Sequence, residues 1–155
     1  MKVIVQRVNC AILTAEGGRT TSIGKGYFVL AGVAEGDVPE DALYLADKIA
    51  KLRIFEDESG KMNLSISEVN GQVLVVSQFT LFANTRRGNR PSFAGYAPPE
   101  EAEPLLVMMI EELRARGIET ASGVFGAHMK IAADCDGPVT IIIDSSDRHV
   151  PRRQA

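Results

Sequence analysis

Two short segments hold the residues of this sequence that could do chemistry. Ser77-Gln78-Phe79-Thr80 follows the apolar run 73–76, where a buried strand is expected to continue into Leu81 and Phe82. Gly137-Pro138 stands directly before a second apolar run, residues 139–143. Polar residues within a strand pattern, and a Gly-Pro pair at a strand entrance, reduce stability unless they serve a purpose. Both segments are therefore candidates for a functional site.

The first segment carries two hydroxyl groups, and three roles for it stay open. Ser77 or Thr80 could be a nucleophile, which normally needs an adjacent base, but no histidine or lysine lies nearby in the sequence. The Gly-x-Ser-x-Gly elbow of serine hydrolases is also absent. Alternatively, the hydroxyls bond to the backbone at a strand edge. In the third interpretation, backbone N–H groups of this turn form an oxyanion hole for an ester.

The Gly137-Pro138 pair has two interpretations. It can be a tight turn at the entrance of a strand, which is the ordinary use of these two residues. It can also be a rigid element that presents its backbone carbonyl groups to a ligand. The sequence pattern around the pair fits both.

Composition and charge restrict the class of protein. The 155 residues, 45% hydrophobic and 24% charged, fit one soluble domain. No apolar run approaches the roughly 18 residues of a membrane helix, and the N-terminus resembles a first strand, so we expect a cytoplasmic protein. The net charge of −3 offers no general attraction for nucleic acid. An RNA contact would have to be local, and the candidates are Arg86, Arg87 and Arg90, whose alternative is a solvated turn.

Neither the cysteines nor the histidines suggest a metal or a cofactor. Cys10 and Cys135 are too few and too far apart to indicate a disulfide framework or a zinc site. His128 and His149 have no partner at metal-ligand spacing, so we interpret them as structural or surface residues. We expect reduced thiols, no metal and no cofactor.

The apolar pattern predicts a single α/β (α+β) domain over residues 1–145, with a flexible tail over 146–155. Two helices are expected, one opened by Pro39 and one running from about residue 98 or 101 to a stop at Gly117. Strands are expected over residues 3–8, 11–13, 27–33, 73–76, 129–133 and 139–143, with another near 124. Helices on a mixed or antiparallel sheet, or on a barrel-like core, accommodate this order.

The whole of residues 1–145 also resembles the D-aminoacyl-tRNA deacylases, esterases that remove D-amino acids from mischarged tRNA. Several blocks carry the resemblance in order: Val5-Gln6-Arg7-Val8, residues 52–57 and 60–65, Ser77-Gln78-Phe79-Thr80-Leu81, Arg90-Pro91-Ser92-Phe93 and Asp136-Gly137-Pro138-Val139-Thr140. Cys135 departs from the family, in which many members have asparagine at this place.

The resemblance implies a cytoplasmic homodimer that acts on D-aminoacyl-tRNA and glycyl-tRNA. Ser77, Gln78, Phe79 and Thr80 would line the pocket for the terminal aminoacyl-adenosine. Gly137 and Pro138, joined by a cis bond, would enter the partner's pocket and reject L-amino acids, while Arg7 supports that loop. Backbone N–H groups near Phe79 and the 2′-hydroxyl of the tRNA would assist catalysis. The alternatives are a non-catalytic module that binds the tRNA 3′ end or an amino acid, and a Thr80-dependent hydrolase of small esters.

Overall fold

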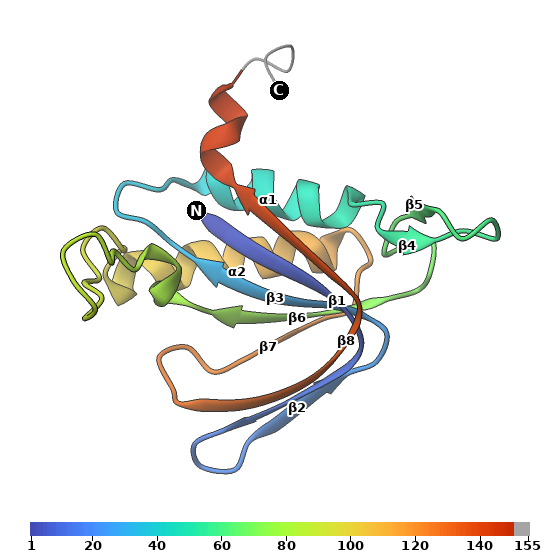
Figure 1. The fold of residues 1–155 in the computed structure, drawn as a ribbon, viewed down its shortest axis with the longest axis horizontal. Coiled ribbons are helices and arrows are strands. Elements are labelled where there is room, and N and C mark those ends of the chain that lie inside the picture. Colours follow the sequence, from blue (N-terminus) through green and yellow to red (C-terminus); the bar gives the residue numbers. More distant parts are fainter. Residues whose placement is uncertain (151–155) are drawn as a thin grey trace.

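A computed structural model describes residues 1–150. One six-stranded sheet curls into a partly closed barrel, and two helices cover one of its faces (Figure 1). This architecture confirms the predicted α+β class with two main helices and a mixed sheet.

The sheet is built around the long first strand, β1 (Lys2–Ala15). β1 lies antiparallel to β2 (Thr20–Ile23), β3 (Gly26–Gly32) and β8 (Met129–Asp144). On the far side of β3, β6 (Gln72–Ser77) and β7 (Thr120–Ser122) follow in parallel. β4 (Phe55–Glu56) and β5 (Met62–Leu64) form a separate hairpin. The strands expected over residues 3–8 and 11–13 are therefore parts of one strand.

Both helices pack through the apolar faces that their spacing predicts. α1 (Pro39–Lys51) buries Ala42, Leu45, Ala46 and Ile49, and α2 (Pro99–Ala115) buries a stripe that includes Leu105, Met109 and Leu113. α2 begins at Pro99, so Pro104 occupies its sixth position rather than the first turn. The carbonyl of Glu100, which is solvent-exposed, is the group that loses an intrahelical donor. No helix in the described part of the chain has the length and apolarity that a membrane span requires.

The core has two parts, one on each face of the sheet. The larger part lies between the helices and the sheet and includes Val5, Tyr27 and Val75. The smaller part fills the curled half of the sheet and includes Leu13 and Leu74. Alternate residues of a strand point to opposite faces, and in β6 Val75 belongs to the larger part while its neighbour Leu74 belongs to the smaller. The same central strands therefore support both parts.

The chain beyond residue 145 continues into a short 3-10 helix, η2 (Ser145–His149), that lies against α1. Arg148 Nε is 2.9 Å from Asp41 Oδ1, and Asp41 Oδ2 accepts a 2.9 Å hydrogen bond from the Val38 N–H. Residues 146–149, which were expected to be part of a flexible tail, thus belong to a 3-10 helix, and Arg148 pairs with Asp41 of α1. The Val150 N–H donates a 3.1 Å hydrogen bond to the Asp147 carbonyl, and the last part of that expected tail, residues 151–155, lies outside the described residues.

Asp41→Asn is expected to destabilise the fold by about 2 kcal/mol at pH 7, the scale of hydrogen bonds to a charged group. Burial of Asp41 opposes its ionisation, but the Val38 N–H, Ser145, the Met1 ammonium and Arg148 outweigh burial and lower its pKa. A lowered folded-state pKa contributes stability above the unfolded value, about 3.9, which disappears as the pH falls through the folded value.

Urea denaturation at pH 7 and pH 3 measures this difference. The exposed Asp147, two residues into η2, provides the matched control Asp147→Asn. A loss of stability that is the same at both pH values, or equal in the two variants, would contradict the role of the Asp41 carboxylate.

Candidate active site

The first candidate segment ends strand β6 instead of extending it. The Gln78 N–H donates a 2.8 Å hydrogen bond to the Ala31 carbonyl, which continues the pairing with β3. The chain then turns into a 3-10 helix, η1 (Phe79–Phe82). The expected continuation of the strand into Leu81 and Phe82 is therefore wrong, because the backbone leaves the sheet after Ser77.

This turn leaves two backbone donors free. The first intrahelical N–H groups of a helix have no partner within it, and in η1 the first bonded one is the Leu81 N–H, which donates to Gln78 at 3.4 Å. Within residues 1–150, the N–H groups of Phe79 and Thr80 donate to no other backbone or side-chain acceptor. They can therefore bind an oxygen atom of a ligand.

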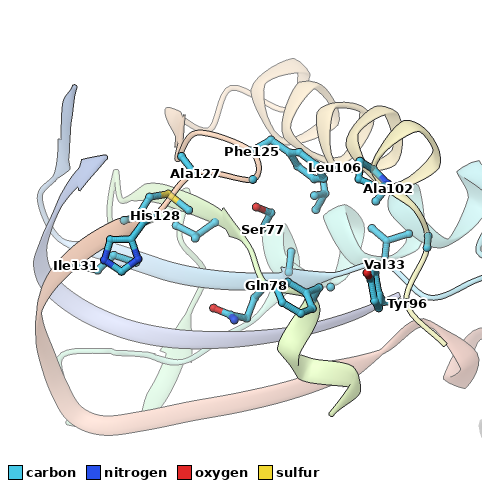
Figure 2. Close-up of a pocket in the computed structure, with 18 residues that line it drawn as sticks. Val33, Ser77, Gln78, Tyr96, Ala102, Leu106, Phe125, Ala127, His128 and Ile131 are labelled. Atoms are coloured by element: carbon cyan, nitrogen blue, oxygen red, sulfur yellow. The ribbon is translucent and has the colours of Figure 1, made fainter. Parts of the chain in front are cut away.

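A cavity of about 450 Å³ opens beside this turn (Figure 2). Its walls come from the end of β6, from α2 and from the segment that leads into β8. Ser77, Gln78 and Phe79 line it, whereas Thr80 does not. The Thr80 hydroxyl instead accepts a hydrogen bond from the Gln78 side-chain amide. The other lining residues are mostly apolar and include Val33, Ala102, Leu106, Phe125, Met129 and Ile131.

The lining residues carry little charge. They include no aspartate, glutamate, lysine or arginine, and the polar ones are Ser77, Gln78, Tyr96 and His128. A hydroxyl nucleophile would need a base beside it, and no described hydrogen bond joins Ser77 to a histidine, lysine or carboxylate. Over residues 1–150, no three or more His, Cys, Asp or Glu side chains are grouped to hold a metal ion. The arrangement suits an ester carbonyl held by backbone donors.

Sequence reasoning missed the cavity wall that faces Ser77. Phe125, Ala127 and His128 come from the turn before β8, and Tyr96 comes from the loop before α2 (Figure 2). None of them lies in a periodic pattern, and the interpretation of His128 as a structural or surface residue overlooked its place at the cavity. Only the tertiary structure brings these residues opposite Ser77.

An aromatic cluster joins the cavity to the arginine-rich loop. The Phe79 ring lies 5.3 Å from the ring of Phe93 and 5.3 Å from that of Tyr96. The loop between η1 and Phe93 is closed by paired backbone hydrogen bonds of 2.7 and 3.0 Å between Asn84 and Ser92. Arg86, Arg87 and Arg90 are all exposed on this loop, outside the cavity lining.

The second candidate segment lies inside a strand rather than at its entrance. Along the β1–β8 pairing, Gln6 faces Thr140 and Val8 faces Cys135, so residues 136–139 lie opposite Arg7 alone. The chain therefore leaves the sheet in a four-residue excursion, which we call the Gly-Pro loop (residues 136–139). The Gly137–Pro138 bond is cis, Gly137 has a φ of +118°, and both residues are exposed.

The Arg7 side chain connects the Gly-Pro loop to the rest of the domain. Its side chain is 5% exposed, and Nη1 donates a 2.6 Å hydrogen bond to the Ile54 carbonyl. Nε lies 2.8 Å from Asp136 Oδ2, although the buried N–H is not aligned for a hydrogen bond, and Nη2 lies 3.8 Å from Glu56 Oε1. Neither Arg7 nor the Gly-Pro loop lines the cavity of its own chain.

Comparison with known proteins shows the family. A family model described as D-Tyr-tRNA(Tyr) deacylase matches residues 4–144. A D-aminoacyl-tRNA deacylase of Thermomicrobium roseum is 54% identical over 147 residues, which cover 95% of this chain and 96% of the relative. One of Chloroflexus aurantiacus is 52% identical over 153 residues, with 99% and 96% covered.

Two solved structures share the fold. The c-Myc DNA unwinding element binding protein matches with a TM-score of 0.85 and 40% identity, over 93% of this chain and 98% of that one. A probable eukaryotic D-amino acid tRNA deacylase matches with a TM-score of 0.77 at 16% identity, over 92% and 97%, which shows a likeness of fold alone. By the match over residues 4–144 and the close relatives, this chain belongs to the D-Tyr-tRNA(Tyr) deacylase family.

Proposed function

We propose that this protein hydrolyses the ester bond of D-aminoacyl-tRNA in the cytoplasm and accepts glycyl-tRNA as well. The observation that carries the proposal is the end of β6. There, Ser77, Gln78 and Phe79 line an apolar cavity, and the backbone N–H groups of Phe79 and Thr80 have no described acceptor. The names of the relatives from Thermomicrobium and Chloroflexus point to the same reaction.

In the proposed mechanism, the ester carbonyl oxygen accepts hydrogen bonds from the N–H groups of Phe79 and Thr80. The oxygen of a water molecule adds to the carbonyl carbon, and the N–H groups stabilise the negative charge of the tetrahedral intermediate. The bond from this carbon to the ribose 3′ oxygen then breaks. That oxygen takes up one proton of the attacking water to become the 3′-hydroxyl of tRNA. The second proton passes to solvent, and the amino acid leaves as a carboxylate. The neighbouring 2′-hydroxyl of the substrate positions the attacking water.

Selectivity is proposed to come from a second copy of the chain. The Gly-Pro loop is exposed and lies outside the cavity of its own chain, which supports a homodimer in which each loop enters the partner's cavity. Ile142, 67% exposed in the same strand, offers apolar surface for such a contact. The loop's carbonyl groups would collide with an L side chain, so selectivity comes from rejection. Glycine has no side chain to reject.

Three classes of activity are separated by one assay. The protein, present at one hundredth of the substrate concentration by design, is mixed with D-tyrosyl-tRNA or with D-tyrosine ethyl ester, and free D-tyrosine is followed. We expect many turnovers of the tRNA ester and slow hydrolysis of the ethyl ester. Release that stops at one equivalent or fewer would indicate a binding module, and equal rates on both esters would indicate a small-ester hydrolase.

Arg86, Arg87 and Arg90 are proposed to contact tRNA phosphates. Replacing each arginine by Gln is expected to weaken tRNA binding. It should also make the negative slope of log K, the association constant, against log salt concentration shallower by roughly one unit or less. Fluorescence titration at several salt concentrations measures this. Lys51→Gln, at the exposed end of α1, is the matched control. If all three arginine variants keep the slope of the control, the loop is a solvated turn.

A further inference from the structure

Among residues 1–150, His128 is the one member of the cavity lining whose side chain can carry a positive charge. The lining holds no lysine or arginine, and a histidine changes its charge between pH 5 and pH 8. In Figure 2 its imidazole lies beside Ile131, on the wall opposite Tyr96, with the Gln78 amide between them. A positive charge at this wall would act on whatever part of the ligand lies there.

The backbone around His128 is held in place while its side chain is free. The His128 carbonyl accepts a 2.9 Å hydrogen bond from the Glu16 N–H, and the Ala127 N–H donates to the Val124 carbonyl at 3.3 Å. The side chain is exposed and, within residues 1–150, makes no ion pair or hydrogen bond. Its titratable and charged neighbours are Glu16 in the β1–β2 turn, Lys130 in β8 and Tyr96 across the cavity. The imidazole is therefore available to a ligand.

The ligand offers one group of the right charge. The terminal nucleotide of an aminoacyl-tRNA carries a positive α-ammonium group, an uncharged ester and base, and one anion, the phosphodiester to the preceding nucleotide. An imidazolium would repel the ammonium group and attract the phosphodiester. We propose that protonated His128 binds this phosphodiester and thereby holds the terminal nucleotide in register with the ester site. This inference rests on the proposed function, because it assumes that the cavity takes the tRNA 3′ end.

Two non-hydrolysable probes measure how much the phosphate contributes to affinity. Both are 3′-deoxy-3′-(D-tyrosylamido)adenosine, one with a free 5′-hydroxyl and one with a 5′-methyl phosphate, whose single charge does not change between pH 5.5 and 8.5. Calorimetry gives the affinity of each at both pH values. We expect the phosphate to increase affinity about fivefold at pH 5.5, the upper end for an exposed ion pair, and by less than twofold at pH 8.5.

Variants of His128 and His149 test which histidine causes the gain in affinity from the phosphate. His128→Asn is expected to lose the phosphate increment at pH 5.5, and His128→Lys to keep it at both pH values, because lysine stays charged. His149→Asn, in η2 and outside the cavity lining, should behave as the parent protein. The KM for D-tyrosyl-tRNA at pH 5.5 should rise in His128→Asn, whereas His149→Asn should keep both the KM and the turnover number of the parent protein.

Several outcomes would overturn the assignment. An equal loss of affinity for both probes in His128→Asn would place its contact on the nucleoside or the amino acid. A hundredfold fall in turnover number would make His128 a catalytic base. A phosphate increment that survives in His128→Asn would move the contact elsewhere. Failure of both probes to bind the parent protein, together with no turnover of D-tyrosyl-tRNA, would instead refute the proposed function.

Discussion

A D-tyrosyl-tRNA that ends in 2′-deoxyadenosine is expected to bind normally and to react about 10²–10³-fold more slowly than the ribose form. The loss of one preorganised catalytic group has this scale. The cavity lining offers no carboxylate and no lysine to activate water, and Ser77 has no described partner that could act as a base. We therefore propose that the hydroxyl group that positions the attacking water comes from the substrate. Single-turnover rates with saturating protein measure the chemical step apart from binding.

Thr80→Ala is the companion variant. It removes a hydroxyl group that accepts from the Gln78 amide but leaves the Thr80 N–H in place. We expect measurable hydrolysis by this variant, at a rate well above that of the parent protein on the deoxy substrate. Normal turnover of the deoxy substrate, combined with complete inactivity of a correctly folded Thr80→Ala protein, would make Thr80 the nucleophile and would refute the backbone mechanism.

Gly137→Ala is expected to reduce the preference for D- over L-tyrosyl-tRNA by about 10–100-fold, or roughly 1.4–2.8 kcal/mol in activation free energy. The φ of +118° at Gly137 is a conformation that L side chains rarely adopt. An added Cβ would lie 2.8 Å from Val139 Cγ2 and 3.0 Å from the Val139 nitrogen. We therefore expect the Gly-Pro loop to move, so that in the proposed dimer its carbonyl groups would no longer exclude an L side chain from the partner's cavity.

The control for this variant separates backbone strain from loop position. Gly18 has a φ of +88° in the β1–β2 turn, and an added Cβ there meets nothing within 4 Å. Gly18→Ala should cost stability without changing the ratio of D and L rates. If a folded, dimeric Gly137→Ala protein keeps the D/L ratio of the parent, the Gly-Pro loop does not determine selectivity.

Much of the fold was predictable because local patterns determine it. Pro39 at a helix start and apolar residues at Ala42, Leu45 and Ile49 describe α1 without any knowledge of its partners. The course of β8 was not predictable. Its two apolar halves are separated by the Gly-Pro loop, and only the pairing with β1 shows that they form one strand. Helical contacts lie close in sequence, whereas this pairing joins residues at opposite ends of the chain.

The site was predictable in part for a similar reason. Ser77 and Gln78 could be identified from the sequence because they are polar residues that directly follow an apolar run. Phe125 and His128 lie in a turn without periodicity, so no local signal marks them as cavity residues. The support of the Gly-Pro loop by Arg7 was indicated by the family resemblance alone. No local pattern marks it, because the Nε–Asp136 contact spans two strands that meet only in the folded sheet.

Chiral selectivity on a tRNA ester can be measured with two substrates that differ only in the configuration of one carbon atom. D-tyrosyl-tRNA and L-tyrosyl-tRNA, charged on the same tRNA preparation, are incubated separately with the same limiting amount of protein, and the remaining ester is counted over time. We expect complete loss of the D ester over many turnovers, while the L ester decays at the rate without protein. Equal decay of both esters, or loss of the L ester first, would contradict this selectivity.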